Sequence, residues 1–357
     1  MNAPISDSTL LIRAADLRDR QECARIESWV RGAEGATPFH RPAWLKATAD
    51  GCGQDAYYLL AEDALGTLAG VLPLTLIHSP LFGRALVSSG FAVGGGIAAR
   101  TRRAVQQLAD AGWRLAEQMS CTTMELRGGM LPNEGWQVKD HVYAGFVRPL
   151  AADDEAELTA IPRKQRAEVR RALSGDLTVH VGSAERDRAW HYAVYAESVR
   201  NLGTPVFPRA LFDTVLDAFA EEADILTVCA GEEPVASVLS LYHDGAVMPY
   251  WGGGKWQARA LRANDLMYYA LMNHARTKGC DRFDFGRSKV GTGAAAFKKN
   301  WGFDAQPLSY AVRTADGQEP RDINPLSPRY RLKVALWQKL PLPLANRIGP
   351  WIARGLG

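Results

Sequence analysis

Apolar and polar positions along this 357-residue chain predict the same set of strands and helices twice. In the first half, the apolar run at 56–63 and AGVLPL at 69–74 are joined by a short turn and predict a hairpin. In the second half, ILTVCAGE at 225–232 and ASVLSL at 236–241 predict another hairpin. After each hairpin, apolar residues recur at three- and four-residue steps, which predicts an amphipathic helix.

The two halves also share landmarks in the same order. Each hairpin is followed by three glycines, Gly94–Gly96 and Gly252–Gly254, which we expect to end a strand. After the helix comes a strand in which a cysteine is followed four residues later by a carboxylate: Cys121 with Glu125, and Cys280 with Asp284. This common order indicates an internal duplication with a period of about 160 residues.

The element order, strand–helix–helix–hairpin–strand–helix–strand, predicts an α/β domain in each half, with a mixed sheet flanked by helices. In the second half, helices are expected at 184–201 and 208–223, and Pro208 suits a helix start because its missing N–H leaves no bond unmade. We expect an N-terminal domain at 1–150, a C-terminal catalytic domain at 151–320 and a basic amphipathic tail at 321–357.

Composition narrows the class of protein. The 47% apolar and 23% charged fractions are those of an ordinary globular protein, and a net charge of +3 implies no global polyanion partner. The five cysteines are scattered without a CxxC pair, which favours reduced thiols. The N-terminus lacks a signal-peptide pattern, and no apolar run reaches the roughly 18 residues that cross a bilayer. We therefore expect a cytoplasmic protein.

The sequence lacks the motifs of several other kinds of site. The seven histidines show no metal-ligand spacing, and GxSxG, HExxH and GxGxxG do not occur. We expect no metal and no tightly bound cofactor.

Four segments carry a resemblance to a known family: TPFHRPAWL (37–45), PRKQRAEVRRAL (162–173), NLGTPVFPRALF (201–212) and FDFGRSKVGTGAAAFKKNWGF (283–303). In the last, Phe297-Lys298 followed by Trp301-Gly302 matches the F-K-x-x-aromatic-G signature of FemAB-type proteins. Over roughly residues 10–315 the chain resembles a tandem of GNAT-type (acyl-CoA N-acyltransferase-like) domains. The segments FHRPAWL and GTPVFP most resemble those of FemAB-like proteins associated with exosortase (PEP-CTERM) and exopolysaccharide systems.

The resemblance implies an N-acyltransferase. Such an enzyme moves an acyl or aminoacyl group from acyl-CoA or aminoacyl-tRNA to an amine of a cell-envelope or exopolysaccharide precursor, either a small molecule or a lipid- or nucleotide-linked one. The glycine-rich loop that holds CoA in simple acetyltransferases is replaced here by KWQARALRANDL (255–266), which leaves the donor open. A non-catalytic binding or scaffold protein of such a system, holding its ligand in the inter-domain cleft, is the alternative.

Acyl transfer needs a polarised carbonyl and an amine that loses a proton. Gly252–Gly254, after Tyr250 and Trp251, suit an oxyanion-binding strand end because glycine lets a ligand approach the backbone, although a bulge would also explain them. Asp284 lies in the apolar strand FDF, where burial would raise its pKa and make it a general base. Its alternative is a structural carboxylate that caps a loop or pairs with Arg287.

Lys298 is the residue that the resemblance singles out. It implies that Lys298 stabilises charge during transfer; the alternative is a surface lysine on a helix whose buried stripe is Ala294, Phe297 and Trp301. Lys298, Asp284 and Tyr250 form the candidate catalytic set, and Arg287 and Ser288 are candidate donor contacts.

The helix at 162–173 presents a basic face that suits phosphate groups of CoA, tRNA or a linked acceptor, or is simply solvated. The candidate substrate-binding residues are Phe39, His40, Arg166, Arg170, Asn201, Gly203, Thr204 and Phe207. The stretch Asn201–Gly203 is equally an ordinary helix stop.

The tail holds six basic residues and no acidic one between Ile323 and Gly357, interleaved with apolar residues and broken by prolines. This pattern predicts short amphipathic helices. Residues 325–357 are therefore a candidate contact with the inner face of the cytoplasmic membrane, or helices packed on the domains.

Overall fold

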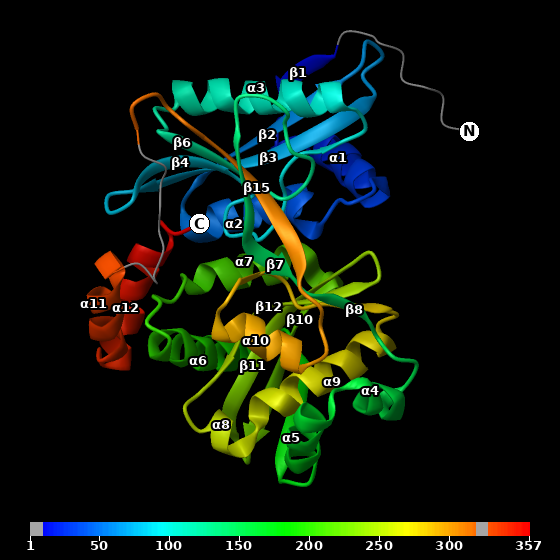
Figure 1. Cartoon of the computed structure of the whole chain (residues 1–357), viewed down its shortest axis with the longest axis vertical. Coiled ribbons are helices and arrows are strands. Elements are labelled where there is room, and N and C mark those ends of the chain that lie inside the picture. Colours follow the sequence, from blue (N-terminus) through cyan, green and yellow to red (C-terminus); the bar gives the residue numbers. More distant parts are fainter. Residues whose placement is uncertain (1–9, 319–327) are drawn as a thin grey trace. The chain divides into compact units, whose positions relative to one another are not determined.

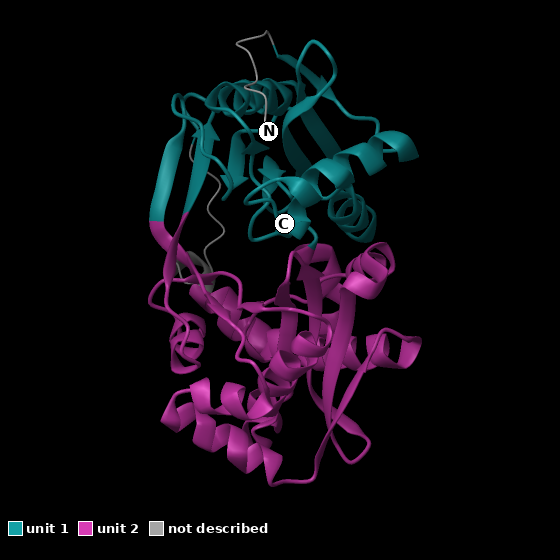
Figure 2. Cartoon of the chain, turned by 90° about the vertical axis from the view of Figure 1, so that its right-hand side faces the viewer, with its two compact units in different colours: residues 1–140, 309–323, 354–357 teal, residues 141–308, 324–353 magenta. Residues whose placement is uncertain are grey.

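The structure, a computed structural model, describes residues 10–318 and 328–357 (Figure 1). Contacts divide it into two compact units (Figure 2). Unit 1 draws its described residues from 1–140, 309–323 and 354–357, and unit 2 from 141–308 and 324–353. These ranges differ from the expected divisions at 150 and 320, because stretches from late in the chain return to unit 1.

Unit 1 begins with a strand and two helices and continues as a hairpin, a crossover helix and further strands. Its helices are α1 (Arg20–Gly32), η1 (Pro38–His40), α2 (Pro42–Cys52) and α3 (Arg102–Gln118). Its strands are β1 (Leu11–Ala14), β2 (Asp55–Glu62), β3 (Leu68–Ser79), β4 (Gly83–Ser88), β5 (Ala98–Ala99) and β6 (Thr123–Arg127). Two long strands, β7 (Gln137–Gly145) and β15 (Gln306–Thr314), carry the chain from one unit into the other.

Unit 2 repeats this plan with additional helices. Its strands are β8 (Val147–Pro149), β9 (Leu177–Gly182), β10 (Ala223–Ala230), β11 (Glu233–His243), β12 (Ala246–Gly254), β13 (Arg282–Asp284) and β14 (Ser288–Lys289). Its helices are α4 (Asp154–Ala160), α5 (Arg163–Leu173), α6 (Glu185–Asn201), α7 (Arg209–Phe219), η2 (Ala220–Glu222), α8 (Ala258–Leu261), α9 (Ala263–Thr277), α10 (Gly293–Asn300), α11 (Pro328–Gln338) and α12 (Leu342–Ala353).

Strand pairing follows the same scheme in both units. In unit 1 the order is β1-β2-β3-β4-β6-β15, with β4 and β6 parallel and the other neighbours on this path for which a register is given antiparallel. In unit 2 the order is β9-β10-β11-β12-β13-β8, with only β12 and β13 parallel. A helix, α3 or α9, connects each parallel pair. The expected α/β class, with two mixed sheets flanked by helices, is confirmed.

The last strand of each sheet comes from the other half of the sequence. β8 follows unit 1 in sequence but pairs with β13 of unit 2, whereas β15 follows unit 2 in sequence but pairs with β6 of unit 1. This exchange explains why a boundary read from a linear repeat differs from the division by contacts.

The glycines at 94–96 do not end a strand as expected. β4 stops at Ser88, and Ser89 and Phe91 both have positive φ, so the chain leaves the sheet before the glycines are reached. In unit 2 the corresponding Gly252–Gly254 do end β12.

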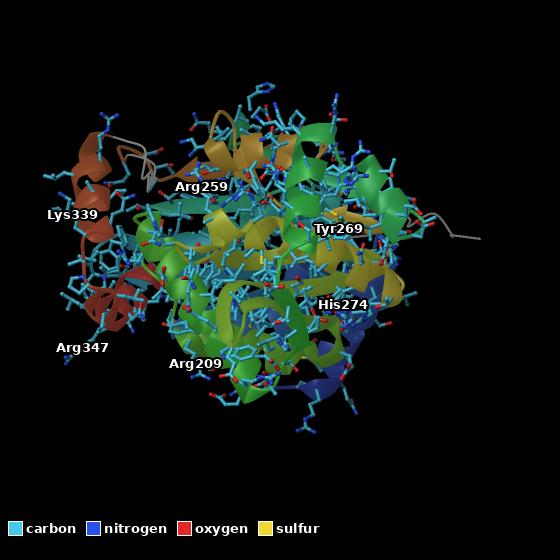
Figure 3. All side chains as sticks on the ribbon, turned by 90° about the horizontal axis from the view of Figure 1, so that it is seen from below. Arg209, Arg259, Tyr269, His274, Lys339 and Arg347 are labelled. Carbon is cyan, nitrogen blue, oxygen red and sulfur yellow. The ribbon has the colours of Figure 1, made fainter. Side chains whose placement is uncertain are left out.

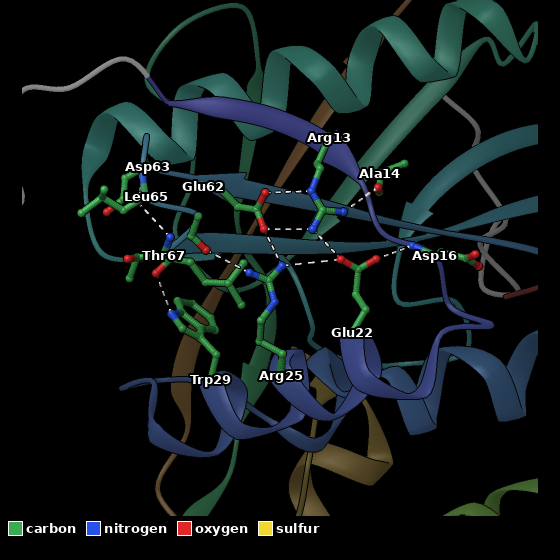
Figure 4. A network of polar contacts seen from close by, with 12 residues as sticks. Arg13, Ala14, Asp16, Glu22, Arg25, Trp29, Glu62, Asp63, Leu65 and Thr67 are labelled. Carbon is green, nitrogen blue, oxygen red and sulfur yellow. Dashed lines mark hydrogen bonds and ion pairs between the residues drawn. The ribbon is translucent and has the colours of Figure 1, made fainter.

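An ion-pair network ties β1, α1 and β2 together in unit 1 (Figure 4). Arg13 contacts Glu62 through two nitrogens, at 2.7 and 2.9 Å, and also contacts Glu22. Arg25 contacts the same Glu62 carboxylate. Burial alone would raise the pKa of Glu62, but the hydrogen bonds from Arg13 and Arg25 outweigh it and lower that pKa.

In unit 2, α6 and α9 cover opposite faces of the sheet. Residues alternate along a strand, so Leu226 and Val228 share the core of α9 while Thr227 points toward α6. Polar contacts tie α9 to neighbouring elements: His274 Nε2 lies 2.8 Å from Asp224, and the Tyr269 hydroxyl donates to the carbonyl of Asp154 at 2.9 Å. Tyr269 and His274 are labelled in Figure 3.

The two predicted helices before the second hairpin are present as α6 and α7, although α7 ends at Phe219. The tail forms the helices α11 and α12; Pro341 lies between them, whereas Pro350 is inside α12. The start of the expected tail, up to residue 327, lies outside the described residues. Among the helices of residues 10–318 and 328–357, none is long and apolar enough to span a bilayer.

Candidate active site

The candidate site of unit 2 is built around β12. Its pairing with β11 shifts by one residue, since Leu239 pairs with Trp251 but Ser240 pairs with Pro249. Tyr250 is therefore the extra residue of a β-bulge. Bulges redirect side chains and recur beside active sites.

The parallel pairing of β12 with β13 is short. It comprises only Ala246 with Arg282 and Val247 with Phe283. β12 continues to Gly254, while β13 ends at Asp284 and the chain turns to β14. The bulge at Tyr250 thus lies on the stretch of β12 that extends past this pairing.

The three glycines of β12 have a packing reason for lacking side chains. A Cβ on Gly253 would lie 2.6 Å from Ser198 Cβ of α6, and one on Gly254 would lie 2.7 Å from Ala258 Cβ. A Cβ on Gly252 would lie 2.9 Å from Val238. Close packing from both faces of the sheet therefore accounts for these glycines, and oxyanion binding at them stays a prediction.

Aromatic side chains surround the bulge. The Tyr250 and Trp251 rings are 4.8 Å apart, and Trp251 contacts Phe212 at 5.0 Å and Phe207 at 6.5 Å. Phe207, a predicted substrate contact, is thus brought to β12. Phe212 was not identified from the sequence, although its place on the inner face of an amphipathic helix next to GTPVFP could have indicated it.

Lys298 is buried in α10, with 9% of its surface exposed. Thr292 caps this helix, and Ala295 and Lys298 are its buried residues, whereas Ala294 is exposed. The alternative of a surface lysine, with Ala294 in the buried stripe, is therefore wrong. The ammonium group donates to the carbonyl oxygens of Gly286 at 3.1 Å and Arg287 at 3.0 Å.

The surroundings of Lys298 weaken its charged state. Its Nζ lies over two aromatic rings, 5.3 Å from the centre of Phe146 and 5.5 Å from that of Phe285, and these contacts favour the ammonium form. Burial lowers the pKa of Lys298 to about 8, against a raising effect of Asp284. A lysine ammonium carries three N–H groups, so one more donor can be aimed at a ligand.

Asp284 ends β13 and interacts electrostatically with Lys298. Its Oδ1 accepts a hydrogen bond from the backbone N–H of Gly286 at 2.8 Å. Burial raises the pKa of Asp284, while this hydrogen bond and the Lys298 charge oppose the rise. The structure therefore brings together two predicted catalytic residues whose pKa values move toward each other.

The matching carboxylate of unit 1 has a different environment. Glu125 accepts a hydrogen bond from Arg127 Nε at 2.7 Å, so a permanent cation neutralises it. Asp284 instead interacts with the amine of Lys298, whose pKa is lowered. This difference favours unit 2 as the unit with proton-transfer chemistry.

Arg287 and Ser288 lie on the turn that Lys298 holds. The Arg287 guanidinium lies over the Tyr143 ring at 4.4 Å, and Ser288 is buried in β14, where it pairs with Ala144. Neither arrangement by itself shows an anion contact, so donor binding by these two residues stays a prediction.

The segment that replaces the glycine-rich loop is closed by the protein itself. The Trp256 N–H donates to the Glu197 carboxylate at 3.0 Å, and Lys255 pairs with Glu233 at 3.1 Å. The chain then turns into α8. A negative group thus already occupies one of the N–H donors that a diphosphate would need, so the segment does not fit a CoA diphosphate in the usual manner.

α5 packs on α9 and carries the predicted basic face. Gln165 donates to Asp265 at 2.5 Å and Glu168 accepts from Arg262 at 2.7 Å, both toward α9. Away from them, Arg163, Arg166, Ala167 and Arg170 line a surface hollow of about 420 Å³. Arg163 and Arg166 lie in the N-terminal half of the helix, whose dipole favours an anion, whereas Arg170 lies in its last turn.

The remaining predicted acceptor residues lie at the end of α6, where they contact α11. The Asn201 carbonyl accepts a hydrogen bond from Gln338 at 3.1 Å, and Gly203, with φ +81°, leaves no room for a side chain beside Val334. Thr204 is exposed, and its N–H donates to Val199. This turn docks the tail helix, so a role in substrate binding stays a prediction.

Phe39 and His40 belong to η1 of unit 1. Each has 1% of its surface exposed, and Phe39 packs edge-on against Trp44 at 4.8 Å. Their burial favours a packing role.

Metal-binding clusters and disulfides are absent from the parts of the chain that the structure describes. No group of three or more His, Cys, Asp and Glu side chains there could hold a metal ion. All five cysteines are free.

Comparison with known proteins identifies the kind of domain. The family model described as "Acetyltransferase (GNAT) domain" matches residues 162–299, from the start of α5 to the end of α10. A search of curated proteins gave no match. Unit 2 therefore carries an acyltransferase domain, and the matched residues include both Lys298 and Asp284.

Solved structures share the fold of most of the chain at low identity. The crystal structure of FemX matches with a TM-score of 0.63 and 15% identity, covering 80% of this chain and 95% of that one. A tandem GNAT protein from the clavulanic acid biosynthesis pathway matches at 0.55 and 12%, covering 87% and 100%. L-PGS from Bacillus licheniformis matches at 0.54 and 15%, covering 90% and 98%. The tandem GNAT-type fold expected from the sequence is thereby confirmed.

Proposed function

We propose that unit 2 transfers an acyl or aminoacyl group from an activated donor to an amine of a cell-envelope or exopolysaccharide precursor, on the cytoplasmic side of the membrane. The observation that carries the proposal is the electrostatic interaction between buried Lys298 and half-buried Asp284, both within the residues matched by the acetyltransferase model. The exopolysaccharide and PEP-CTERM setting of the acceptor rests on the FHRPAWL and GTPVFP segments alone.

The pair supplies the proton transfers that the reaction requires. An ammonium acceptor must lose a proton before its nitrogen attacks the donor carbonyl, and the leaving thiolate or ribose oxygen must gain one. Asp284, with its raised pKa, takes the proton from the amine. Lys298, with a pKa of about 8, exchanges protons readily near neutral pH and donates to the oxygen that becomes negative.

β12 positions the donor carbonyl in this proposal. Beyond the bulge at Tyr250 the strand extends past its pairing with β13, so that a ligand can add to it as an extra strand would. The aromatic group of Tyr250, Trp251 and Phe207 then borders the acyl group or the acceptor.

The donor is held by side chains rather than by a glycine-rich loop. The closed segment at Trp256 leaves the phosphate contacts to the hollow lined by Arg163, Arg166 and Arg170. This hollow lies near the C-terminal end of α10, since a Cβ on Gly302 would lie 3.2 Å from Pro162 at the start of α5. Three arginines spaced along one helix suit the repeated phosphates of aminoacyl-tRNA. Acyl-CoA is the other donor in this proposal.

A binding or scaffold protein remains the second candidate. One observation favours it: Lys298 already donates to the carbonyl groups of Gly286 and Arg287, so it also has a structural task. In that case the chain would bind its ligand without turnover.

Label transfer separates the two functions. The full chain is incubated with an amine-bearing envelope precursor fraction and either radiolabelled acetyl-CoA or tRNA charged with radiolabelled amino acids. A transferase moves the label from a hydroxylamine-sensitive thioester or ester into a hydroxylamine-resistant amide. A binding protein retains donor or acceptor on a filter but forms no resistant label.

A charge-reversal variant tests the donor site in the same assay. Arg166→Glu/Arg170→Glu should weaken retention of charged tRNA by at least tenfold, because each lost phosphate contact also removes counterion release. Arg20→Glu/Arg114→Glu, at exposed positions of unit 1, is the matched control. Equal retention by the two variants would exclude α5 as the donor site.

A further inference from the structure

α12 buries its small residues and exposes its large apolar ones. Ala345, Gly349 and Ala353 recur at four-residue steps and are buried. A second stripe on the same helix is formed by Leu344, Ile348 and Trp351, with 45%, 36% and 48% of their surface exposed. A helix that only packs on its own protein places its large apolar side chains inward. The exposed stripe therefore points to a further apolar environment.

α11 shows the same division. One side is bound to α6, because Val334 packs against Gly203 and the Gln338 carbonyl accepts from Arg200 at 3.1 Å. Leu332 and Leu336, four residues apart, are 70% and 59% exposed. α11 is thus held in place by one face and presents a second apolar face to solvent.

Positive charge accompanies both stripes, and negative charge is absent. Residues 328–357 contain no aspartate or glutamate. The basic side chains Arg331, Lys333, Lys339 and Arg347 are exposed on or between the two helices; Lys339 and Arg347 are labelled in Figure 3. We call these four basic side chains, together with Leu332, Leu336, Leu344, Ile348 and Trp351, the tail surface.

We propose that the tail surface docks the protein on an anionic lipid bilayer. Leucine, isoleucine and tryptophan side chains enter the boundary between headgroups and acyl chains, and basic side chains beside them contact lipid phosphates. An acidic protein partner would satisfy the charges but would not need five large exposed apolar residues. The inference does not depend on the transfer reaction, but it would place the enzyme next to lipid-linked acceptors.

Flotation with vesicles tests the proposal on the full chain. We expect the protein to float with vesicles of phosphatidylcholine and phosphatidylglycerol and to stay behind with phosphatidylcholine alone. Leu344→Ser/Ile348→Ser/Trp351→Ser should abolish flotation. Lys333→Gln/Lys339→Gln should weaken it by roughly 25-fold, since one basic residue near an anionic surface accounts for about fivefold.

Matched variants at exposed positions outside the tail serve as controls. Leu65→Ser/Leu81→Ser/Val138→Ser and Arg20→Gln/Arg114→Gln should float like the parent protein. Sedimentation velocity of every variant tests whether a second copy covers the stripe instead. The proposal is overturned if the parent protein ignores anionic vesicles, or if the triple serine variant floats normally, or if its only effect is to convert a dimer into monomers.

Discussion

The pH dependence of stability should reveal Lys298 directly. Unfolding returns this lysine to water, where its pKa is 10.5, whereas burial holds the pKa at about 8 in the folded protein. Between these values the unfolded chain binds a proton that the folded chain does not. Stability therefore rises with pH in this window. One pKa unit corresponds to about 1.4 kcal/mol, so the free energy of unfolding should gain roughly 2–3 kcal/mol from this group between pH 7 and pH 10.

The comparison of Lys298→Met with the parent protein isolates this gain, because tyrosines and cysteines titrate in both proteins alike. Urea unfolding at pH 7 and pH 10 provides the two free energies. At pH 7 the substitution removes an unfavourable buried charge but leaves the carbonyls of Gly286 and Arg287 without their donor, so the net change should be small. At pH 10 the variant should be less stable than the parent by roughly 2–3 kcal/mol more than at pH 7.

Lys299→Met provides the control, since this neighbour on α10 is exposed. It should leave the pH dependence of the parent unchanged. If Lys298→Met and the parent protein show parallel stability curves from pH 7 to pH 10, Lys298 does not have a lowered pKa. The proton-transfer role assigned to it would then lose its basis.

Two further substitutions probe the packing of each unit. Gly253→Ala should lower the free energy of unfolding by about 1–3 kcal/mol, because its new methyl group meets Ser198. Adding Ser198→Gly should recover part of this loss. Strictly additive effects of the two substitutions in a double-mutant cycle would contradict the contact. Glu62→Gln should cost about 2 kcal/mol at pH 7, because the half-exposed Arg13 and Arg25 lose their shared carboxylate but keep Glu22. Because the pKa of Glu62 is lowered, its stabilisation exists above the ordinary carboxyl pKa and is lost as pH falls, so the difference between parent and variant should shrink toward pH 3; a constant difference would refute the network's role.

Local patterns predicted much of the fold. The hairpins β2–β3 and β10–β11 and the helices α3, α6 and α9 follow from periodicity and turn residues, because each element buries one face against its own sheet. The repeat predicted two units, and the shared order of strand pairing supports it. The pairing of β8 with β13 and of β15 with β6 could not be predicted. A local pattern predicts that a segment is a strand, but it does not say which sheet the strand joins.

The candidate site was predictable in its residues but not in its contacts. The FDF strand predicted a carboxylate of raised pKa, and Asp284 has a raised pKa and an electrostatic interaction with Lys298, the lysine that the resemblance singled out; their catalytic roles stay predictions. The bulge at Tyr250 left no signal, because one extra residue in a strand does not alter the apolar pattern enough. Closure of the segment at Trp256 depends on Glu197, a residue 59 positions away, which no local pattern links to it.

The central claim is that proton transfer for acyl transfer takes place in unit 2, at Asp284 and Lys298. The most direct measurement is the rate of label transfer into a hydroxylamine-resistant amide by two matched variants, Asp284→Asn and Glu125→Gln, which alter the corresponding carboxylates of the two units. Asp284→Asn should lose transfer by at least a hundredfold while still binding the donor. Glu125→Gln should keep transfer near the parent rate. Loss of transfer in Glu125→Gln with normal transfer in Asp284→Asn would contradict the account.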